Sequence, residues 1–362
     1  MIFYQIFIHT STLHLLQIDL KLTFVDMASE NILVDLKNKI YKPVYWLEGE
    51  ESYFIDEIIN YAENKILSES EASFNLTIFY GKDADWAEVI NACKQYPMFS
   101  DKKVVLLKEA QSMKEKELER LESYINNPLS STMLFVSHKD KKIDGKTKFA
   151  KLLKAKTELL STKKLYPNQL PDWSRGMIQK LGLSIEQKAL MLLVDHIGND
   201  LSRIHNEIEK LAVNLKGRTT ITEDDIEKYI GISKEFNVFE LQDAIGKKNF
   251  EKAIRINQYF AANPKAAPIQ MVLPALYNFF SKVYMVFGAG TYDEREIASV
   301  LGMGNNTYFV KDYLAAAKNF GQQGIERILL LLHEYNLKGI GINDKGTEDA
   351  DLIKELLVKM MS

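Results

Sequence analysis

Short runs of apolar, β-branched and aromatic residues alternate with amphipathic stretches along the front half of this chain. The runs predict strands at residues 43–47, 76–80, 104–107, 133–136 and 159–165, and the stretches between them predict helices at residues 53–67, 85–94, 114–125 and 146–153. Alternating strands and helices are typical of a mainly parallel sheet covered by helices, because each parallel connection has to cross a face of the sheet. The sequence therefore predicts an α/β domain.

The pattern changes after Leu165, and no further strand is expected. Residues 166–172 contain two prolines and no apolar period, which is typical of a hinge or linker. The following segments have helical spacing, with apolar residues three and four apart on one face. Short helices are expected at residues 173–181, 185–196, 201–215 and 221–230, and longer helical stripes from about residue 236, including Ile269, Val272, Leu273, Leu276, Phe280, Tyr284 and Phe287.

The length of 362 residues favours several domains, because single hydrophobic cores stop growing at about 250 to 300 residues. We expect the α/β domain at residues 27–166, a small helical lid at residues 167–232 and a helical domain at residues 233–362. Residues 1–26 are expected to be a non-native or disordered extension outside the fold, since Met27 has the form of a true start.

Charge and composition exclude several functional classes. The net charge of −3 means that the protein as a whole is not attracted to the phosphates of nucleic acid, so any DNA contact has to come from a local basic patch. Cys93 is the only cysteine, which excludes an internal disulfide framework and a cysteine-rich zinc site, and we expect it to be buried. The six histidines show no metal-ligand spacing. The first 26 residues lack a basic start and an uninterrupted apolar span, so a cytoplasmic protein without a membrane partner is expected.

The turn after the first predicted strand is where a nucleotide-binding sheet carries its phosphate loop. Here Glu48, Glu50 and Glu51 surround Gly49, and carboxylates at this place should repel a polyphosphate. Gly145-Lys146-Thr147 is the only Gly-Lys-Thr, but Asp140 stands where the phosphate-loop spacing requires glycine. The sequence therefore predicts no working phosphate loop, and no cofactor, metal or catalytic residue.

Two surface features point to partners. Met98 and Phe99 follow a proline in a turn between a predicted helix and strand. They either fold back onto the core or protrude as an anchor for a pocket in another protein, and the residues alone favour the first alternative. Residues 139–156 hold eight lysines, which either form a solvated helix surface or meet a phosphate backbone.

From about residue 40 to its end, the chain resembles the delta subunits of the bacterial DNA polymerase III clamp loader, a divergent branch of the clamp-loader ATPases. The matching stretches are residues 44–51, 85–100, 104–109, 198–201, 207–211 and 237–241. The resemblance implies an AAA+-like sheet domain without a P-loop, a helical lid and a C-terminal collar through which five subunits assemble. Residues 1–26 have no counterpart in the family.

The implied function is non-catalytic opening of the ring-shaped sliding clamp for loading onto primed DNA. The protein is then part of a DNA-directed DNA polymerase, a nucleotidyltransferase complex, in the cytoplasm at the nucleoid and replisome. Its implied partners are the clamp (beta subunit), and the ATP-binding clamp-loader subunits and delta-prime of a hetero-pentamer. Primed DNA is reached through the complex.

The clamp-contacting pair of the family falls on Met98 and Phe99, so the resemblance favours the anchor. The pair is expected to enter a pocket of the clamp near its subunit interface and to favour the open ring, after ATP binding by neighbouring subunits exposes it.

Some relatives place an aromatic residue against DNA near residues 337–341, and this chain has none there. Lys338 is therefore only a candidate DNA-facing residue, together with Lys141, Lys142 and Lys146. Two alternatives remain: an ATPase using Gly145-Lys146-Thr147, and a DNA-binding adaptor.

Overall fold

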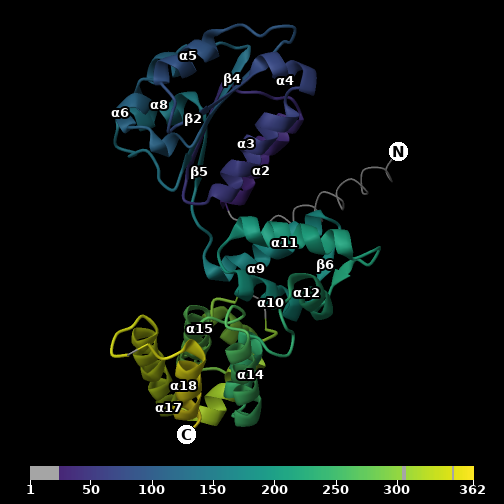
Figure 1. The fold of residues 1–362 in the computed structure, drawn as a ribbon, viewed down its shortest axis with the longest axis vertical. Coiled ribbons are helices and arrows are strands. Elements are labelled where there is room, and N and C mark those ends of the chain that lie inside the picture. Colours follow the sequence, from purple (N-terminus) through teal and green to yellow (C-terminus); the bar gives the residue numbers. More distant parts are fainter. Residues whose placement is uncertain (1–23, 304–306, 345) are drawn as a thin grey trace, which may run out of the picture. The chain divides into compact units, whose positions relative to one another are not determined.

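Five parallel strands form the centre of the front part of the protein (Figure 1). The computed structural model describes residues 24–303, 307–344 and 346–362. Its main strands are β1 (Val44–Gly49), β2 (Leu76–Tyr80), β3 (Lys103–Lys108), β4 (Thr132–Lys139) and β5 (Glu158–Thr162). They lie in the order β2-β3-β4-β1-β5, and every neighbouring pair is parallel. The predicted α/β fold with a parallel sheet is confirmed.

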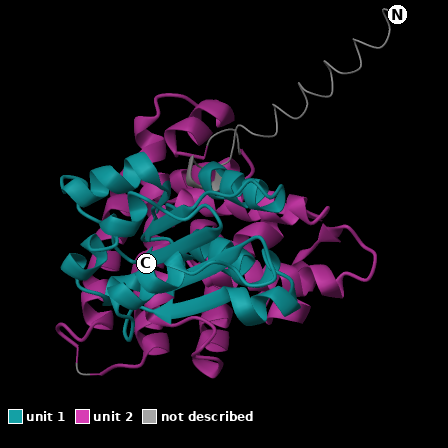
Figure 2. Cartoon of the chain, turned by 90° about the horizontal axis from the view of Figure 1, so that it is seen from above, with its two compact units in different colours: residues 1–166 teal, residues 167–362 magenta. Residues whose placement is uncertain are grey.

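The chain divides into two compact units, residues 1–166 and residues 167–362 (Figure 2). The division falls within the proline-containing segment 166–172. The second unit holds both the expected lid and the expected C-terminal helical domain, and their separation stays a prediction. Of the extension expected at residues 1–26, residues 1–23 lie outside the described residues, and the last three belong to helix α2 (Phe24–Lys37).

The helices of the first unit differ in places from the sequence prediction. They are α2, α3 (Ser52–Lys65), α4 (Glu69–Asn75), α5 (Trp86–Lys94), α6 (Glu115–Glu119), α7 (Glu122–Ile125) and α8 (Lys148–Lys156), with a 3-10 turn η2 (Ala110–Ser112). The single helix expected at residues 114–125 is wrong. It breaks because Arg120 and Leu121 donate to carbonyls three residues back, at 3.2 and 3.0 Å, which tightens the turn. Helix α4 was not expected, because a polar segment held by a capping box at Ser68 has no apolar period.

The core of the first unit lies on the sheet. Trp46 in β1 is fully buried and packs edge-on against Phe149 of α8, with ring centroids 5.4 Å apart. Cys93 of α5 belongs to the same core, as expected, and burial raises the pKa of its thiol to about 12. Cys93 is therefore a small apolar core residue at neutral pH.

The second unit is mainly helical. Its helices are α9 (Leu170–Lys180), α10 (Gln187–Ile197), α11 (Leu201–Asn214), α12 (Glu223–Ile230), α13 (Val238–Gly246), α14 (Phe250–Ala262), α15 (Ile269–Gly288), α16 (Glu294–Val300), α17 (Val310–Gly339) and α18 (Asp349–Met361), after a 3-10 turn η3 (Pro167–Gln169). The expectation that strands end at Leu165 is wrong, because β6 (Ser184–Ile185) pairs with β7 (Thr220–Ile221). Two residues are too few to show an alternating pattern.

The core of the second unit confirms most of the expected stripe along α15. Val272, Leu276 and Phe280 are fully buried, but Tyr284 and Phe287 are each 38% exposed, because the core covers α15 fully only as far as Val283. The stripe predicted to continue to residue 287 is wrong in this last part. Among the described residues of the whole chain, no helix has the length and apolar character needed to cross a membrane.

Candidate partner-binding surface

The loop between α5 and β3 carries Met98 and Phe99 at the surface. We call residues 95–102 the anchor loop and Met98 with Phe99 the anchor pair. Helix α5 ends before this loop because Pro97 disfavours helical conformation in the residue that precedes it, and Gln95 is already extended. Met98 is 54% exposed and Phe99 is 91% exposed. The alternative in which both side chains fold back onto the core is therefore wrong.

The backbone of the anchor loop is bound by a single side chain from helix α4. The N–H of Met98 donates to Oδ1 of Asn75 at 2.7 Å, and Nδ2 of Asn75 donates to the carbonyl of Met98 at 2.8 Å. Nδ2 also donates to the carbonyl of Glu71 at 3.1 Å, and Asn75 is only 1% exposed. The amide is thus fixed in α4 and satisfies both polar groups of the Met98 backbone.

Aromatic side chains enlarge the apolar surface around the anchor pair. The rings of Phe74 and Phe99 meet edge to face, with centroids 6.3 Å apart. Phe74 is 59% exposed, and Tyr96 of the anchor loop is 75% exposed. A cluster of exposed large apolar side chains is costly in water and marks protein interaction sites.

Polar contacts tie both ends of the anchor loop to the unit. The hydroxyl of Ser100 donates to Glu71 at 2.8 Å, and hydrogen bonds from Ser68 and Ser100 lower the pKa of the Glu71 carboxyl to about 2. At the other end, Nζ of Lys103 donates to Oε1 of Gln95 at 2.9 Å. The carboxylate of Glu71 is therefore charged at neutral pH, and the loop stays anchored at both ends.

The carboxyl group of Glu48, near the end of β1, is hydrogen-bonded by other groups of the first unit. Oε2 of Glu48 accepts the indole N–H of Trp46 at 3.0 Å and the backbone N–H of Ile143 at 3.2 Å. Oε1 accepts the hydroxyl of Ser161 at 3.3 Å, and Glu48 is 6% exposed. The expectation that three carboxylates face a polyphosphate is wrong for Glu48, because its carboxyl group is buried and hydrogen-bonded within the unit.

The amino terminus of α3 is also occupied by the chain itself. Glu51 is 6% exposed and caps α3, with Oε1 accepting the N–H of Tyr53 at 3.2 Å. A carboxylate thus stands where a phosphate-binding helix offers free N–H groups to its ligand. Of the three glutamates, only Glu50 is exposed.

The Gly-Lys-Thr segment starts a helix. The hydroxyl oxygen of Thr147 accepts the N–H of Ala150 at 3.0 Å, and the hydroxyl donates to the carbonyl of Asp144 at 2.9 Å. Thr147 is thereby the N-cap of α8. A phosphate loop needs this hydroxyl for a metal ion, and here the helix cap uses it.

The predicted DNA-facing lysines lie in both units. Lys141 and Lys146 are exposed and Lys142 is half-buried, all in the segment between β4 and α8. Lys338 lies in α17 of the second unit, 3.4 Å from Glu334 and 3.7 Å from Glu355. Two carboxylates therefore share the charge of Lys338, whereas the other three lysines form a separate basic segment.

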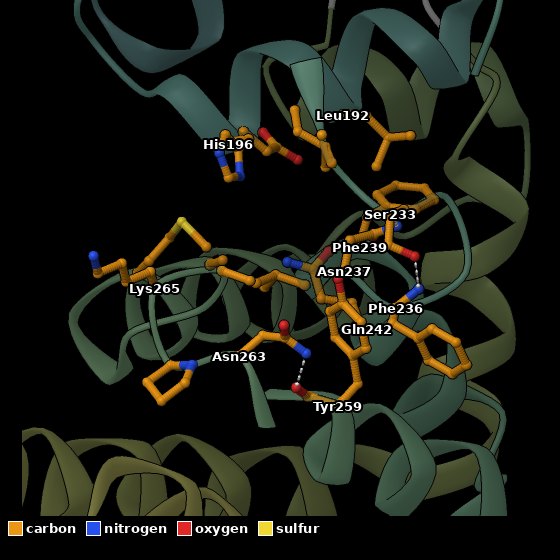
Figure 3. A pocket seen from close by; sticks show the side chains of 18 residues that line it. Leu192, His196, Ser233, Phe236, Asn237, Phe239, Gln242, Tyr259, Asn263 and Lys265 are labelled. Atoms are coloured by element: carbon orange, nitrogen blue, oxygen red, sulfur yellow. Dashed lines mark hydrogen bonds between the residues drawn. The ribbon is translucent and has the colours of Figure 1, made fainter. Parts of the chain in front are cut away.

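A pocket that the sequence did not indicate lies in the second unit (Figure 3). Its volume is about 610 Å³, and its lining includes the stacked rings of Phe236 and Tyr259, 5.1 Å apart. Asn263 donates to the carbonyl of Tyr259 at 3.0 Å, and Ser233 accepts the N–H of Phe236 at 3.1 Å. Several separate segments build the pocket, so no motif marks it.

Polar side chains of two kinds line the pocket. The side chains of Ser233 and Asn263 are engaged by the backbone. Asp195 and His196 also line the pocket, and burial raises the pKa of the Asp195 carboxyl to about 6 and lowers the pKa of the His196 imidazole. Within the described residues, no group of three or more histidine, cysteine, aspartate or glutamate side chains has the arrangement of a metal site. The anchor loop is therefore the stronger candidate site.

Comparison with known proteins identifies relatives along most of the chain. A model described as "DNA polymerase III, delta subunit" matches residues 45–163, and a "middle domain" model matches residues 170–228. A third model, for the C-terminal domain of the same family, matches residues 235–357. The DNA polymerase III subunit delta of Bacillus subtilis is 25% identical over 335 residues, which cover 89% of this chain and 94% of that protein.

Two further relatives agree. A probable DNA polymerase III subunit delta of Aquifex aeolicus is 24% identical over 225 residues, covering 59% of this chain and 62% of that protein. The solved structure of the Bacillus subtilis DNA clamp loader delta protein (YqeN) has a TM-score of 0.53 at 24% identity, covering 92% of this chain and 99% of that one. That structure supports the fold observed here.

Proposed function

This chain belongs to the DNA polymerase III delta-subunit family, and from this premise we propose that it binds and opens the ring-shaped sliding clamp. The observation that carries the proposal is the anchor pair, which is exposed in a loop whose backbone is bound to α4. The clamp offers the pair a pocket near its subunit interface. Burying one methionine and one phenylalanine there contributes roughly 3 to 6 kcal/mol in total.

Opening requires a difference in affinity. A binding protein can shift the ring only if it binds the open form more tightly than the closed form. The anchor pair acts as a wedge because its pocket accepts both side chains fully when the nearby subunit interface is open. ATP chemistry belongs to neighbouring subunits, since Glu51 caps the helix that would otherwise face a phosphate.

We place the chain in a hetero-pentamer with ATP-binding clamp-loader subunits and delta-prime, at the cytoplasmic replisome. Residues 27–166 form the clamp-binding domain, residues 167–232 the lid and residues 233–362 the collar. The exposed Tyr284 and Phe287 at the end of α15 support an assembly role for the last domain, because apolar side chains at a helix end are stabilised by a neighbouring protein.

The direct test uses the purified chain and its cognate clamp. We expect the isolated chain to bind the clamp, and a fluorescence energy transfer pair across the ring interface to report separation on binding. If the chain binds the clamp but the ring interface does not separate, the chain is an adaptor that binds the clamp, and the opening function is refuted. No binding by the isolated chain or by the assembled clamp loader would refute the proposed function altogether.

The basic segment between β4 and α8 is the proposed DNA-facing surface of the assembled loader. Replacing Lys141, Lys142 and Lys146 by alanine should reduce the slope of log K against log salt for primed DNA by roughly two to three, because each phosphate contact contributes about 0.7 to 0.9. Lys210→Ala, whose lysine pairs with Glu207, is the matched control. Lys338→Ala, measured in parallel, tests the fourth predicted residue. An unchanged slope in the triple variant contradicts this assignment.

A further inference from the structure

Asn75 is a buried residue whose side chain forms hydrogen bonds with the backbone of the anchor loop. It spans two parts of the first unit that are 23 residues apart in the sequence, the end of α4 and the anchor loop. We propose that Asn75 is a positioning residue, which orders the anchor pair for the clamp before binding. This inference rests on the proposed function and assigns to that site a residue that does not touch the partner.

The geometry determines which way the anchor pair points. Both hydrogen-bonding groups of the Met98 backbone are held by one amide, at 2.7 and 2.8 Å, so the peptide planes on both sides of Met98 are fixed. Phe99 follows with φ of +56°, a conformation that residues with a Cβ rarely adopt. This strained conformation persists because the surrounding contacts enforce it.

The side chains show why the loop needs such a support. An unrestrained loop would lower its exposed apolar area by turning Met98 and Phe99 inward, yet they remain 54% and 91% exposed. The ring of Phe74, next to Asn75 in α4, lies edge to face with Phe99 and supports it from one side. Ser100 is tied to Glu71 of the same helix at 2.8 Å. Helix α4 is thus the support on which the anchor pair is displayed.

Order before binding raises affinity, because a loop that is already fixed loses less conformational entropy when the complex forms. Without the amide of Asn75, the backbone of residues 98 and 99 becomes free to move, and part of the binding free energy is spent on ordering it. We expect Asn75→Ala to weaken clamp binding about 10- to 100-fold, through ordering alone.

A double-mutant cycle separates positioning from general destabilisation. Asn75→Ala, Phe99→Ala and the double variant are each titrated against the labelled clamp, and hydrogen exchange at the Met98 amide is measured in the free chain. Positioning predicts faster exchange at Met98 in Asn75→Ala, and little further loss of affinity when Phe99 is already alanine. Asn64→Ala is the matched control, because Nδ2 of Asn64 also donates four residues back, at 3.0 Å, but on an exposed face of α3.

Asn75→Asp and Asn75→Ser cover the case in which the alanine variant cannot be used. Asn75→Asp keeps an acceptor for the Met98 N–H, but it places a carboxylate oxygen against the carbonyls of Glu71 and Met98, so a loss of affinity at least as large as in Asn75→Ala is expected. Asn75→Ser, whose hydroxyl can replace at most one bond to Met98, should give the intermediate loss. Additive losses in the cycle, or unchanged affinity in Asn75→Ala while Met98→Ala with Phe99→Ala loses binding, would overturn the positioning role alone. A wild-type chain that does not bind the clamp would remove the proposed function and this inference with it.

Discussion

Replacing Met98 and Phe99 together by alanine is expected to weaken clamp binding by about two to four orders of magnitude. Each side chain contributes roughly 1.5 to 3 kcal/mol when it is buried in the clamp, and about 1.4 kcal/mol corresponds to tenfold in affinity. The loss should appear mainly in a faster dissociation rate, because the pair makes its contacts after encounter. Titration of the labelled clamp with both proteins measures it.

The free chain should keep its stability in this variant. Met98 is 54% exposed and Phe99 is 91% exposed, so their removal takes little from the core, and the free energy of unfolding should change by less than about 0.5 kcal/mol. Tyr292→Ala is the control, since Tyr292 is 90% exposed in the second unit. Clamp affinity within twofold of wild type in the double variant would exclude the anchor pair as the contact.

Trp46→Ala is expected to lower the free energy of unfolding of the first unit by about 3 to 5 kcal/mol. The side chain of Trp46 in β1 is fully buried against Phe149 of α8, so truncation leaves a large cavity. It also removes the indole N–H that Glu48 accepts at 3.0 Å, which leaves a buried carboxylate with one donor fewer. Urea unfolding followed by tryptophan fluorescence, in a Trp173→Phe background that leaves tryptophans in the first unit alone, measures the loss.

Trp46→Phe is the milder variant. Phenylalanine is smaller than tryptophan and lacks the N–H, so a cost of about 1 to 3 kcal/mol is expected from the reduced packing and from the lost bond to Oε2 of Glu48, which keeps the bond from the N–H of Ile143. Equal stability of Trp46→Phe and wild type would show that the indole bond to Glu48 contributes nothing. The bonds from Ile143 and Ser161 would then be the ones that hold the Glu48 carboxyl group.

Elements with strong local patterns could be predicted from the sequence. The strand at residues 76–80 was predicted with the bounds of β2, and helix α11 begins at Leu201 as expected. Helix α4 is absent from the prediction although Ser68 and Glu71 have the spacing of a capping box, because no apolar period follows this start signal in its polar sequence. The pair β6 and β7 is too short for any period to appear.

The candidate site was predicted only in part. The sequence identified Met98 and Phe99. The resemblance to a family favoured an exposed anchor over side chains packed in the core, but no pattern in the neighbouring residues showed that both side chains are exposed. The sequence does not identify Asn75 as part of the site, because an asparagine before a predicted strand gives no indication that its side chain binds a loop 23 residues away.

By itself, the sequence determined the parallel sheet, the helical second half and the absence of glycine where a phosphate loop requires it, because each of these is written in neighbouring residues. Only the tertiary structure decided what the carboxylates and the anchor pair do. Glu48 finds its partners Ile143 and Ser161 at 95 and 113 residues along the chain. A residue type specifies a charge or an apolar surface, but the fold decides whether that group meets a partner within the chain or stays exposed to bind another protein.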